Sequence, residues 1–305
     1  MKIALPGGTG FIGRHLARDL AERGHQVVVI ARGQYTRGQR LPTHEGITFV
    51  QANVTDTGAL TRAFSGCSAV VNCAGTSEDR SQTLRQVHVD GARSVVDAAW
   101  QASVTKLVLV SYLRTRPDIR SDYHRTKWEG EQIVRQSGLD YTILKAGLVY
   151  GKGDHLLHNL GNLLRKLPVF ATVGLREKTV RLIAVEDLVR VIRAALTDER
   201  LSNKTVAVTG PEEFPFSLAA RRIARALGKP FLLVLPFPVF AQRLLAAVSQ
   251  LMPRPLISAS QVQMLADGIS APLPDSQMLP EDLAPTTRFT EEQIRKGLPS
   301  KNDRQ

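Results

Sequence analysis

The sequence predicts an α/β protein with a doubly wound parallel sheet and a smaller C-terminal lobe. Three observations predict it: short β-branched runs alternate with helical patterns, their connections are short, and the runs are continuously apolar. Continuous Val, Ile and Leu runs suit strands that are buried on both faces, as in a parallel sheet covered by helices. Strand–helix alternation of this kind favours right-handed βαβ units.

The first half of the chain supplies these elements in regular order. The expected strands are Lys2–Leu5, Gln26–Ala31, Ile47–Gln51, Ala69–Cys73, Lys106–Ser111 and Tyr141–Leu144. The helical patterns between them are Phe11–Arg23, Thr57–Phe64, Leu84–Gln101 and Asp122–Gln136. We expect residues 1–150 to form the core domain, with residues 179–210 contributing to it.

After Gly151 the pattern loosens and proline becomes frequent. We expect residues 151–178 and 211–305 to form a lobe that closes over the ligand crevice of the core domain. The apolar segment 231–252 is broken by prolines and by Arg243, so it does not predict a membrane span. We expect it to roof a pocket, and an amphipathic contact with a membrane or partner is the alternative. The expected elements here are the stretch Thr179–Ala184, a strand at Thr205–Val208, and helices at His155–Lys166, Val185–Leu196, Ser217–Leu227, Val239–Leu251, Ser258–Ala266 and Thr290–Lys296.

Composition narrows the classes of function. The formal net charge of +12 favours anionic partners such as nucleotide phosphates or an anionic membrane surface, although a diffuse arginine-rich surface is the simpler explanation. Two cysteines and the absence of a signal-peptide pattern predict a cytoplasmic protein, with contact at the inner face of a membrane left open. The histidines show no metal-ligand spacing, and no basic–aromatic strand motif predicts nucleic-acid binding, so we expect neither partner.

A glycine-rich turn follows the first expected strand. Residues 7–13 read Gly-Gly-Thr-Gly-Phe-Ile-Gly, and the turn opens a helix within a strand–helix–strand unit. That context predicts a dinucleotide site of the Rossmann type, with phosphates at the helix N-terminus. We expect Gly7 to permit the sharp turn, Gly10 to let the backbone approach the pyrophosphate, and Gly13 to let the helix pack on the sheet. The cofactor-binding residues expected here are Gly7, Gly8, Thr9, Gly10, Phe11, Ile12, Gly13 and Arg14.

The end of the second strand bears on the choice between NAD and NADP. An acidic residue there would bind the ribose hydroxyls, but the sequence has Ala31 and Arg32, and the next acidic residue is Glu45. A guanidinium can pair with a 2′-phosphate. The sequence therefore favours NADP(H) over NAD(H), with Arg32 as the residue that discriminates and Arg14 as a helper.

At these residues the chain resembles the short-chain dehydrogenase/reductase superfamily, in its extended or atypical, epimerase/dehydratase-like branch. The resemblance includes Asn72-Cys73-Ala74-Gly75 after the fourth strand and the segment 146–151 after the sixth. It implies cofactor contacts from Asn53, Val54, Cys73, Ala74 and Gly75. The proline-rich C-terminal part is similar to a subgroup that includes the nucleotide-binding accessory subunit of respiratory complex I and its bacterial relatives.

The acid/base pair of that superfamily is Tyr-x-x-x-Lys on a helix, and Tyr123 and Lys127 fit it. Residues four apart share a helix face, so the ammonium group would lower the pKa of the phenol and hold the nicotinamide ribose. The resemblance implies that Tyr123 exchanges a proton with the substrate oxygen and that Ser111 hydrogen-bonds it. A second match, Tyr141 with Lys145, lies in an expected strand, where the two residues would be about 13 Å apart. We therefore favour the first pair.

Two functions follow from these residues. The first is an NADP(H)-dependent oxidoreductase that transfers hydride to or from a carbonyl or alcohol, and the apolar C-terminal lobe suggests an apolar substrate. The second is a cofactor-binding accessory or assembly protein of a respiratory or membrane-associated complex. The departure from the extended branch at Lys145-Ala146, where Arg-Pro is common, leaves the substrate open, and the sequence leaves the oligomeric state open as well.

Overall fold

The computed structural model describes residues 1–36, 39–76, 81–118, 121–173, 177–237, 270–272 and 275–298. The chain divides into two compact units. The first comprises Met1–Ala146, Val185–Val208 and Leu273–Ala284, and the second comprises Gly147–Ala184, Thr209–Pro272 and Pro285–Gln305. The helices expected at Val239–Leu251 and Ser258–Ala266 lie outside the described residues.

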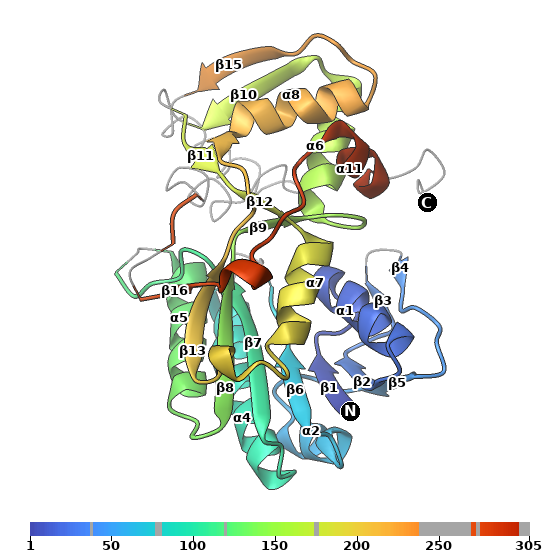
Figure 1. Cartoon of the computed structure of the whole chain (residues 1–305), viewed down its shortest axis with the longest axis vertical. Coiled ribbons are helices and arrows are strands. Elements are labelled where there is room, and N and C mark those ends of the chain that lie inside the picture. The colour runs from blue at the N-terminus through green and yellow to red at the C-terminus, as the bar shows by residue number, and fades with distance from the viewer. Residues whose placement is uncertain are drawn as a thin grey trace. The chain divides into compact units, whose positions relative to one another are not determined.

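An eight-stranded parallel sheet forms the centre of the first unit, in the order β16-β13-β8-β7-β6-β1-β2-β5 (Figure 1). The order reverses between β1 and β6, which is the switch point where doubly wound sheets open a ligand crevice. The strands are β1 (Lys2–Pro6), β2 (Gln26–Ala31), β5 (Ile47–Gln51), β6 (Ala69–Asn72), β7 (Lys106–Tyr112), β8 (Asp140–Ala146), β13 (Lys204–Val208) and β16 (Gln277–Met278). The expectation of a doubly wound parallel sheet is thereby confirmed.

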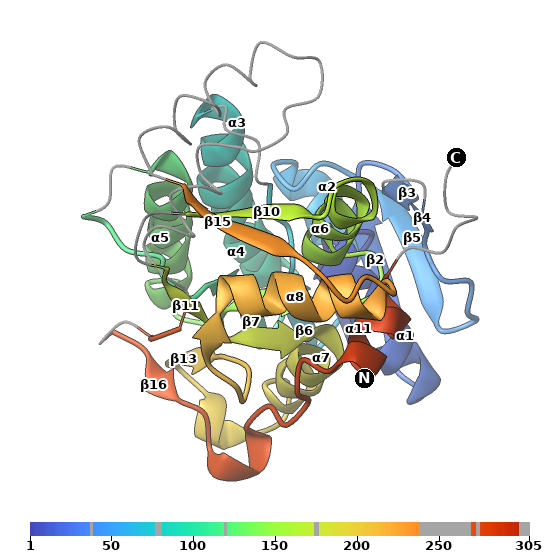
Figure 2. The ribbon, with the colours of Figure 1, turned by 90° about the horizontal axis from the view of Figure 1, so that it is seen from above.

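Helices cover both faces of this sheet, which explains its continuously apolar strands. Figure 2 shows α1 (Phe11–Glu22) and α7 (Val185–Ala194) on one side. The other side carries α2 (Thr57–Phe64), α4 (Gly91–Gln101) and α5 (Asp122–Arg135). Every residue of β6 and β7 is buried between the two layers, as the sequence predicted. A short hairpin, β3 (Tyr35–Thr36) with β4 (Gln39–Arg40), follows β2.

The helix expected at Leu84–Gln101 contains a change of winding. It begins as α3 (Ser81–Arg85), continues as a π-helical turn, η1 (Gln86–Asp90), and ends as α4. Such π turns are rare and frequently occur at functional sites. The apolar periodicity of the sequence predicted the helix, but not this turn.

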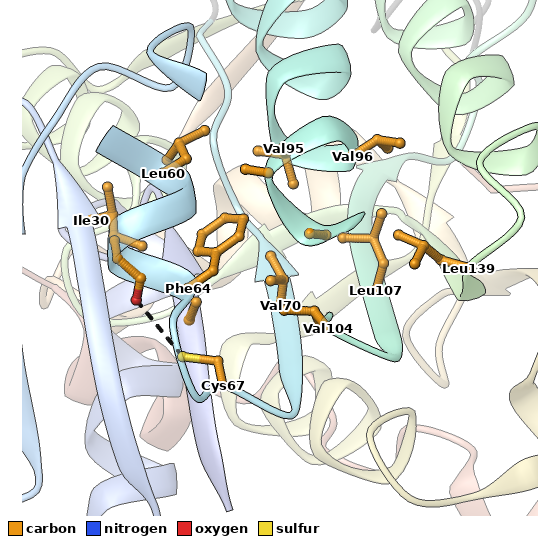
Figure 3. Packing of buried hydrophobic residues seen from close by; sticks show 14 of the residues in the cluster. Ile30, Leu60, Phe64, Cys67, Val70, Val95, Val96, Val104, Leu107 and Leu139 are labelled. Carbon is orange, nitrogen blue, oxygen red and sulfur yellow. Dashed lines mark hydrogen bonds between the residues drawn. The ribbon is translucent and has the colours of Figure 1, made fainter. Parts of the chain in front are cut away.

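A cluster of buried apolar residues lies between the sheet and the layer of α2 and α4 (Figure 3). Phe64 from α2 and Leu107 from β7 are fully buried in it. Cys67 belongs to this cluster, where its thiol donates to the carbonyl oxygen of Ala63 at 3.8 Å. Burial raises the pKa of this thiol, which agrees with a packing role for Cys67.

In its described residues, the second unit combines helices with three strand pairs. Its helices are α6 (His155–Lys166), α8 (Phe216–Ala226) and α11 (Glu291–Gly297). Its pairs are β9 (Leu148–Tyr150) with β12 (Leu182–Ala184), β10 (Val169–Val173) with β15 (Leu233–Phe237), and β11 (Thr179–Val180) with β14 (Phe214–Pro215). The rings of Tyr150, Phe214 and Phe289 pack together at its centre. Two 3-10 turns, η2 (Glu199–Leu201) and η3 (Glu281–Leu283), belong to the first unit. Within the described ranges, no helix combines the length and apolar character needed to cross a bilayer.

Candidate cofactor and active site

The glycine turn between β1 and α1 can be built only with glycine at two positions. Gly7 has a φ of +76°, and a Cβ atom there would lie 2.5 Å from the backbone nitrogen of Ala74. A Cβ atom at Gly13 would lie 2.5 Å from the carbonyl oxygen of Gly7. The turn therefore touches both the loop after β6 and the first turn of α1. Because the backbone is bare here, a ligand can approach it closely.

The N-terminus of α1 offers N–H groups without competing side chains. Gly10 is the N-cap, it makes no side-chain cap, and the first turn contains no acidic residue. The first N–H groups of a helix have no intrahelical acceptor and carry a partial positive charge. Thr9 and Arg14 are buried beside this turn, and Arg14 Nη1 donates to the carbonyl oxygen of Thr9 at 3.2 Å. These features fit the pyrophosphate of a dinucleotide.

Arg32, Asn53 and the glycine turn all follow the carboxyl ends of their strands, so they lie at the same end of the parallel sheet. Arg32 directly follows β2, Asn53 follows β5, and both side chains are exposed. The amide nitrogen of Ala52 donates to the carbonyl oxygen of Ala31 at 3.0 Å, so the two strand ends stay together. Asn53 Oδ1 accepts from the backbone of Thr55 at 3.3 Å.

The loop after β6 lies in contact with the glycine turn. The amide nitrogen of Cys73 donates to the carbonyl oxygen of Pro6 at 2.9 Å, and Asn72 Oδ1 accepts from the backbone of Ala74 at 3.0 Å. These bonds leave Gly75 exposed at the edge. Burial raises the pKa of Cys73 to about 12, so its side chain is a neutral thiol. Val54, expected to contact the cofactor, packs against the start of α4 at Gly91.

Tyr123 and Lys127 share one face of α5, as their spacing predicted. The Nζ atom of Lys127 lies 5.8 Å from the ring centroid of Tyr123. The expected lowering of the Tyr123 pKa by Lys127 is not seen, because burial raises the pKa of the phenol above its usual range. Burial also lowers the pKa of Lys127 to about 8, against the opposing effect of the Glu131 charge. The ring of Tyr123 makes edge-to-face contacts with Tyr112, His88 and His124. At neutral pH this face therefore carries a protonated phenol beside a largely charged amine.

His88, on the π turn, was not among the residues that the sequence singled out. Thr126 Oγ1 donates to the carbonyl oxygen of Asp122 at 2.7 Å, so it accepts from His88 Nδ1 at 3.0 Å. The opposite nitrogen, Nε2, accepts from the backbone N–H of Thr76 at 3.4 Å. Burial, with the charge of Lys127 second, lowers the pKa of His88 to about 3. The imidazole is therefore neutral and links α5 to the loop after β6.

The hydroxyl of Ser111 is hydrogen-bonded to a carboxylate on α5. Its hydroxyl is buried and donates to Glu131 Oε1, from α5, at 2.5 Å. Ser111, His88 and Lys127 do line one cavity of about 10 Å³, together with Asn72. That volume is at the lower limit for one water molecule. The structure thus brings Ser111 and Lys127 to the same wall, while Tyr123 packs among aromatic rings.

Glu131, the partner of Ser111, belongs to a buried cluster of charged residues. Lys145 and Glu131 are both fully buried, with Nζ 3.5 Å from Glu131 Oε2. Lys145 also donates to Asp275 at 2.6 Å and to the carbonyl oxygen of Thr115 at 3.0 Å. Arg135 pairs with Glu131 at 2.9 Å. Lys145 lies on β8 with Tyr141, so the second Tyr/Lys match is in a strand, as expected.

The sheet order, the switch point and the glycine turn define a nucleotide-binding Rossmann protein. Residues 7–157 match the model of a family described as NAD(P)H-binding, and the chain belongs to this NAD(P)-binding Rossmann family. The fold is also that of an epimerase. The UDP-glucose 4-epimerase of Thermotoga maritima superposes with a TM-score of 0.73 over 97% of this chain and 96% of its own, at 17% identity.

Three curated relatives show the range of proteins to which the chain is similar. A ceramide reductase of Caulobacter vibrioides is 29% identical over 77% of this chain and 74% of its own length. The mitochondrial 40 kDa subunit of NADH-ubiquinone oxidoreductase from Neurospora crassa is 24% identical over 73% of this chain and 59% of its own length. The photosystem II assembly factor Ycf39 of Synechocystis is 31% identical over 50% and 46%. The chain thus spans less than two thirds of the length of the last two.

Proposed function

We propose that this protein is an NADP(H)-dependent oxidoreductase that reduces a carbonyl group, or oxidises the corresponding alcohol, on an apolar substrate. The observation that carries the proposal is the placement of Tyr123 and Lys127 on one face of α5, 5.8 Å from ring centroid to amine. The similarity to a ceramide reductase supports the reaction type and an apolar substrate.

The raised pKa of Tyr123 favours a role as a proton donor. A buried phenol that keeps its proton at neutral pH acts as the acid, and it donates that proton to the carbonyl oxygen being reduced. Lys127 is charged below a pH of about 8, and it holds the ribose next to the reacting ring. When bound, NADPH supplies the hydride, and the chain supplies the proton and the orientation.

Arg32 tests the cofactor preference. We expect calorimetric titration of the wild-type protein to give tighter binding of NADPH than of NADH. Arg32→Ala should weaken the binding of NADPH at least tenfold and leave that of NADH nearly unchanged, because only the former has a 2′-phosphate. Arg18→Ala, an exposed arginine on α1, serves as the matched control. Equal losses for both nucleotides would refute the role given to Arg32.

Tyr123 tests the chemistry. The assay follows the oxidation of NADPH with a panel of long-chain ketones and quinones, with sphingolipid ketones added because of the similar ceramide reductase. Tyr123→Phe keeps the ring and its aromatic contacts but removes the hydroxyl group that would donate the proton. We expect at least a hundredfold loss of kcat with unchanged NADPH affinity. A variant that retains the wild-type rate would exclude Tyr123 as the acid.

A second candidate is an accessory or assembly protein that binds the dinucleotide without turnover. The similarities to a subunit of NADH-ubiquinone oxidoreductase and to a photosystem assembly factor favour it. It predicts that the protein co-sediments with a solubilised membrane complex from its own cells, equally for wild type and Tyr123→Phe. Cells that carry only Tyr123→Phe in place of the wild type separate the two functions. An intact complex with normal growth favours the accessory role, and a loss of growth with the complex intact favours the enzyme.

A further inference from the structure

The first unit contains a second cavity, remote from the glycine turn. It lies at the C-terminal end of α1, whereas the turn lies at the N-terminal end, and a helix of this length spans about 18 Å. Its volume is about 420 Å³, within the range of small-molecule sites. The cavity is lined by the end of α1, by α7 and by η3, and α7 contacts both of the other elements.

Positive charge dominates the walls of this cavity. Arg23, Arg190 and Arg193 line it, and none of its lining residues is acidic. Asp19 pairs with Arg193 at 2.8 Å and also with Arg23 at 3.1 Å, so two guanidinium groups share one carboxylate. Two guanidinium groups carry about ten N–H donors, whereas a carboxylate has about four acceptor sites. Donors therefore remain for a further anion.

The histidine in this wall contributes polarity rather than charge. His25 lines the cavity beside Arg23 and Arg193. Burial, followed by the neighbouring positive charges, lowers the pKa of His25. The imidazole therefore adds a polar group to a wall whose positive charge includes that of Arg23 and Arg193.

The cavity wall at η3 is held in place by hydrogen bonds. Arg190 Nη2 donates to the carbonyl oxygen of Ala284 at 2.7 Å, and Arg200 pairs with Asp282 at 2.8 Å. These bonds fix the position of Leu283, which faces the cavity together with Leu196. The site therefore combines a cationic side with an apolar side. Such a combination suits a ligand that has both an anionic group and an apolar body.

We propose that this cavity binds an organic phosphate whose phosphoryl group lies between Arg23, Arg190 and Arg193 and whose apolar part contacts Leu196 and Leu283. Guanidinium forks match phosphoryl oxygens in geometry and charge. The formal charge of +12 on the chain also favours anionic ligands. The proposal does not depend on catalysis by Tyr123, because this cavity and the glycine turn of the candidate cofactor site lie at opposite ends of α1.

The first experiment measures phenyl phosphate binding to the full-length protein by calorimetry, at constant ionic strength and with NADPH present to block the glycine turn. Arg193→Gln should weaken binding at least tenfold. Asp19→Asn should strengthen it at least threefold, because it releases the shared donors. Arg18→Gln, exposed on the same helix, is the matched control and should change nothing. The opposite signs at positions 19 and 193 distinguish a ligand effect from a general loss of stability.

The second experiment distinguishes a lipid headgroup from a soluble ester, because both carry the same phosphate chemistry. Phosphatidylcholine vesicles that contain phosphatidic acid are sedimented with the wild-type protein, Arg193→Gln and Arg18→Gln. Retention that only Arg193→Gln loses assigns the ligand to a headgroup. Phenyl phosphate binding without retention assigns it to a soluble ester. Affinities for phenyl phosphate that are the same in the wild type, Asp19→Asn and Arg193→Gln, or no binding at all, would overturn the proposal.

Discussion

Acid should destabilise this protein through His88, and the size of the effect follows from its surroundings. The imidazole is 6% exposed, and its pKa falls from an ordinary value of 6.5 to about 3. Between these two values the unfolded chain binds a proton that the folded chain does not, so the free energy of unfolding decreases as the pH falls. From pH 7.5 to pH 5 the decrease from this one residue is about 2 kcal/mol.

Urea denaturation at pH 7.5 and at pH 5 measures this quantity, with His88→Asn as the test variant. Asparagine cannot titrate, so the variant should lose about 2 kcal/mol less than the wild type between the two pH values, whatever its stability at pH 7.5. His158→Gln, which replaces an exposed histidine on α6, should keep the wild-type dependence. The same loss in His88→Asn and in the wild type would refute the buried, neutral state assigned to His88.

Three further predictions concern α5 and its surroundings. Gly130→Ala would place a Cβ atom against the carbonyl oxygen of His88 and should lower the free energy of unfolding by ~1–3 kcal/mol. Gly58→Ala in α2, whose Cβ atom would make only ordinary van der Waals contacts with the side chains of Arg62 and Asp56, should raise it by up to ~1 kcal/mol in urea denaturation. Lys145→Met should cost ~3–5 kcal/mol because it removes a buried partner of Glu131, and adding Glu131→Gln should recover part of that loss; no recovery would contradict the pairing. The affinity for NADPH, titrated from pH 6.5 to 9.5, should fall as the pH rises through about 8, where Lys127 loses its charge, and Lys127→Met should remove this dependence.

The glycine turn and α5 show how much of the site local sequence can predict. The spacing of Gly7 and Gly13 reports a steric requirement of the turn, and the structure shows the close backbone contacts that cause it. The four-residue spacing of Tyr123 and Lys127 places them on one helix face, because helical geometry alone decides it. Both predictions depend on residues that are near each other in the chain.

Ser111 and His88 show where local sequence is insufficient. The partner of Ser111 is Glu131, twenty residues away on another element, and this contact exists only once α5 packs on the sheet. The π turn packs closely against α5 at Gly130 and places His88 against Thr126, and no apolar pattern encodes this contact.

The sequence by itself determined the order of strands and helices, the doubly wound sheet and the position of the phosphate-binding turn, because each follows from periodicity or from glycine spacing over a few residues. Only the tertiary structure decided that Lys145 pairs with Asp275, 130 residues further along the chain. It also placed Arg23, which follows α1, and two arginines of α7 around one cavity. Such contacts depend on how distant segments meet, and the distance between them is set by the packed sheet and its helices rather than by their separation in sequence.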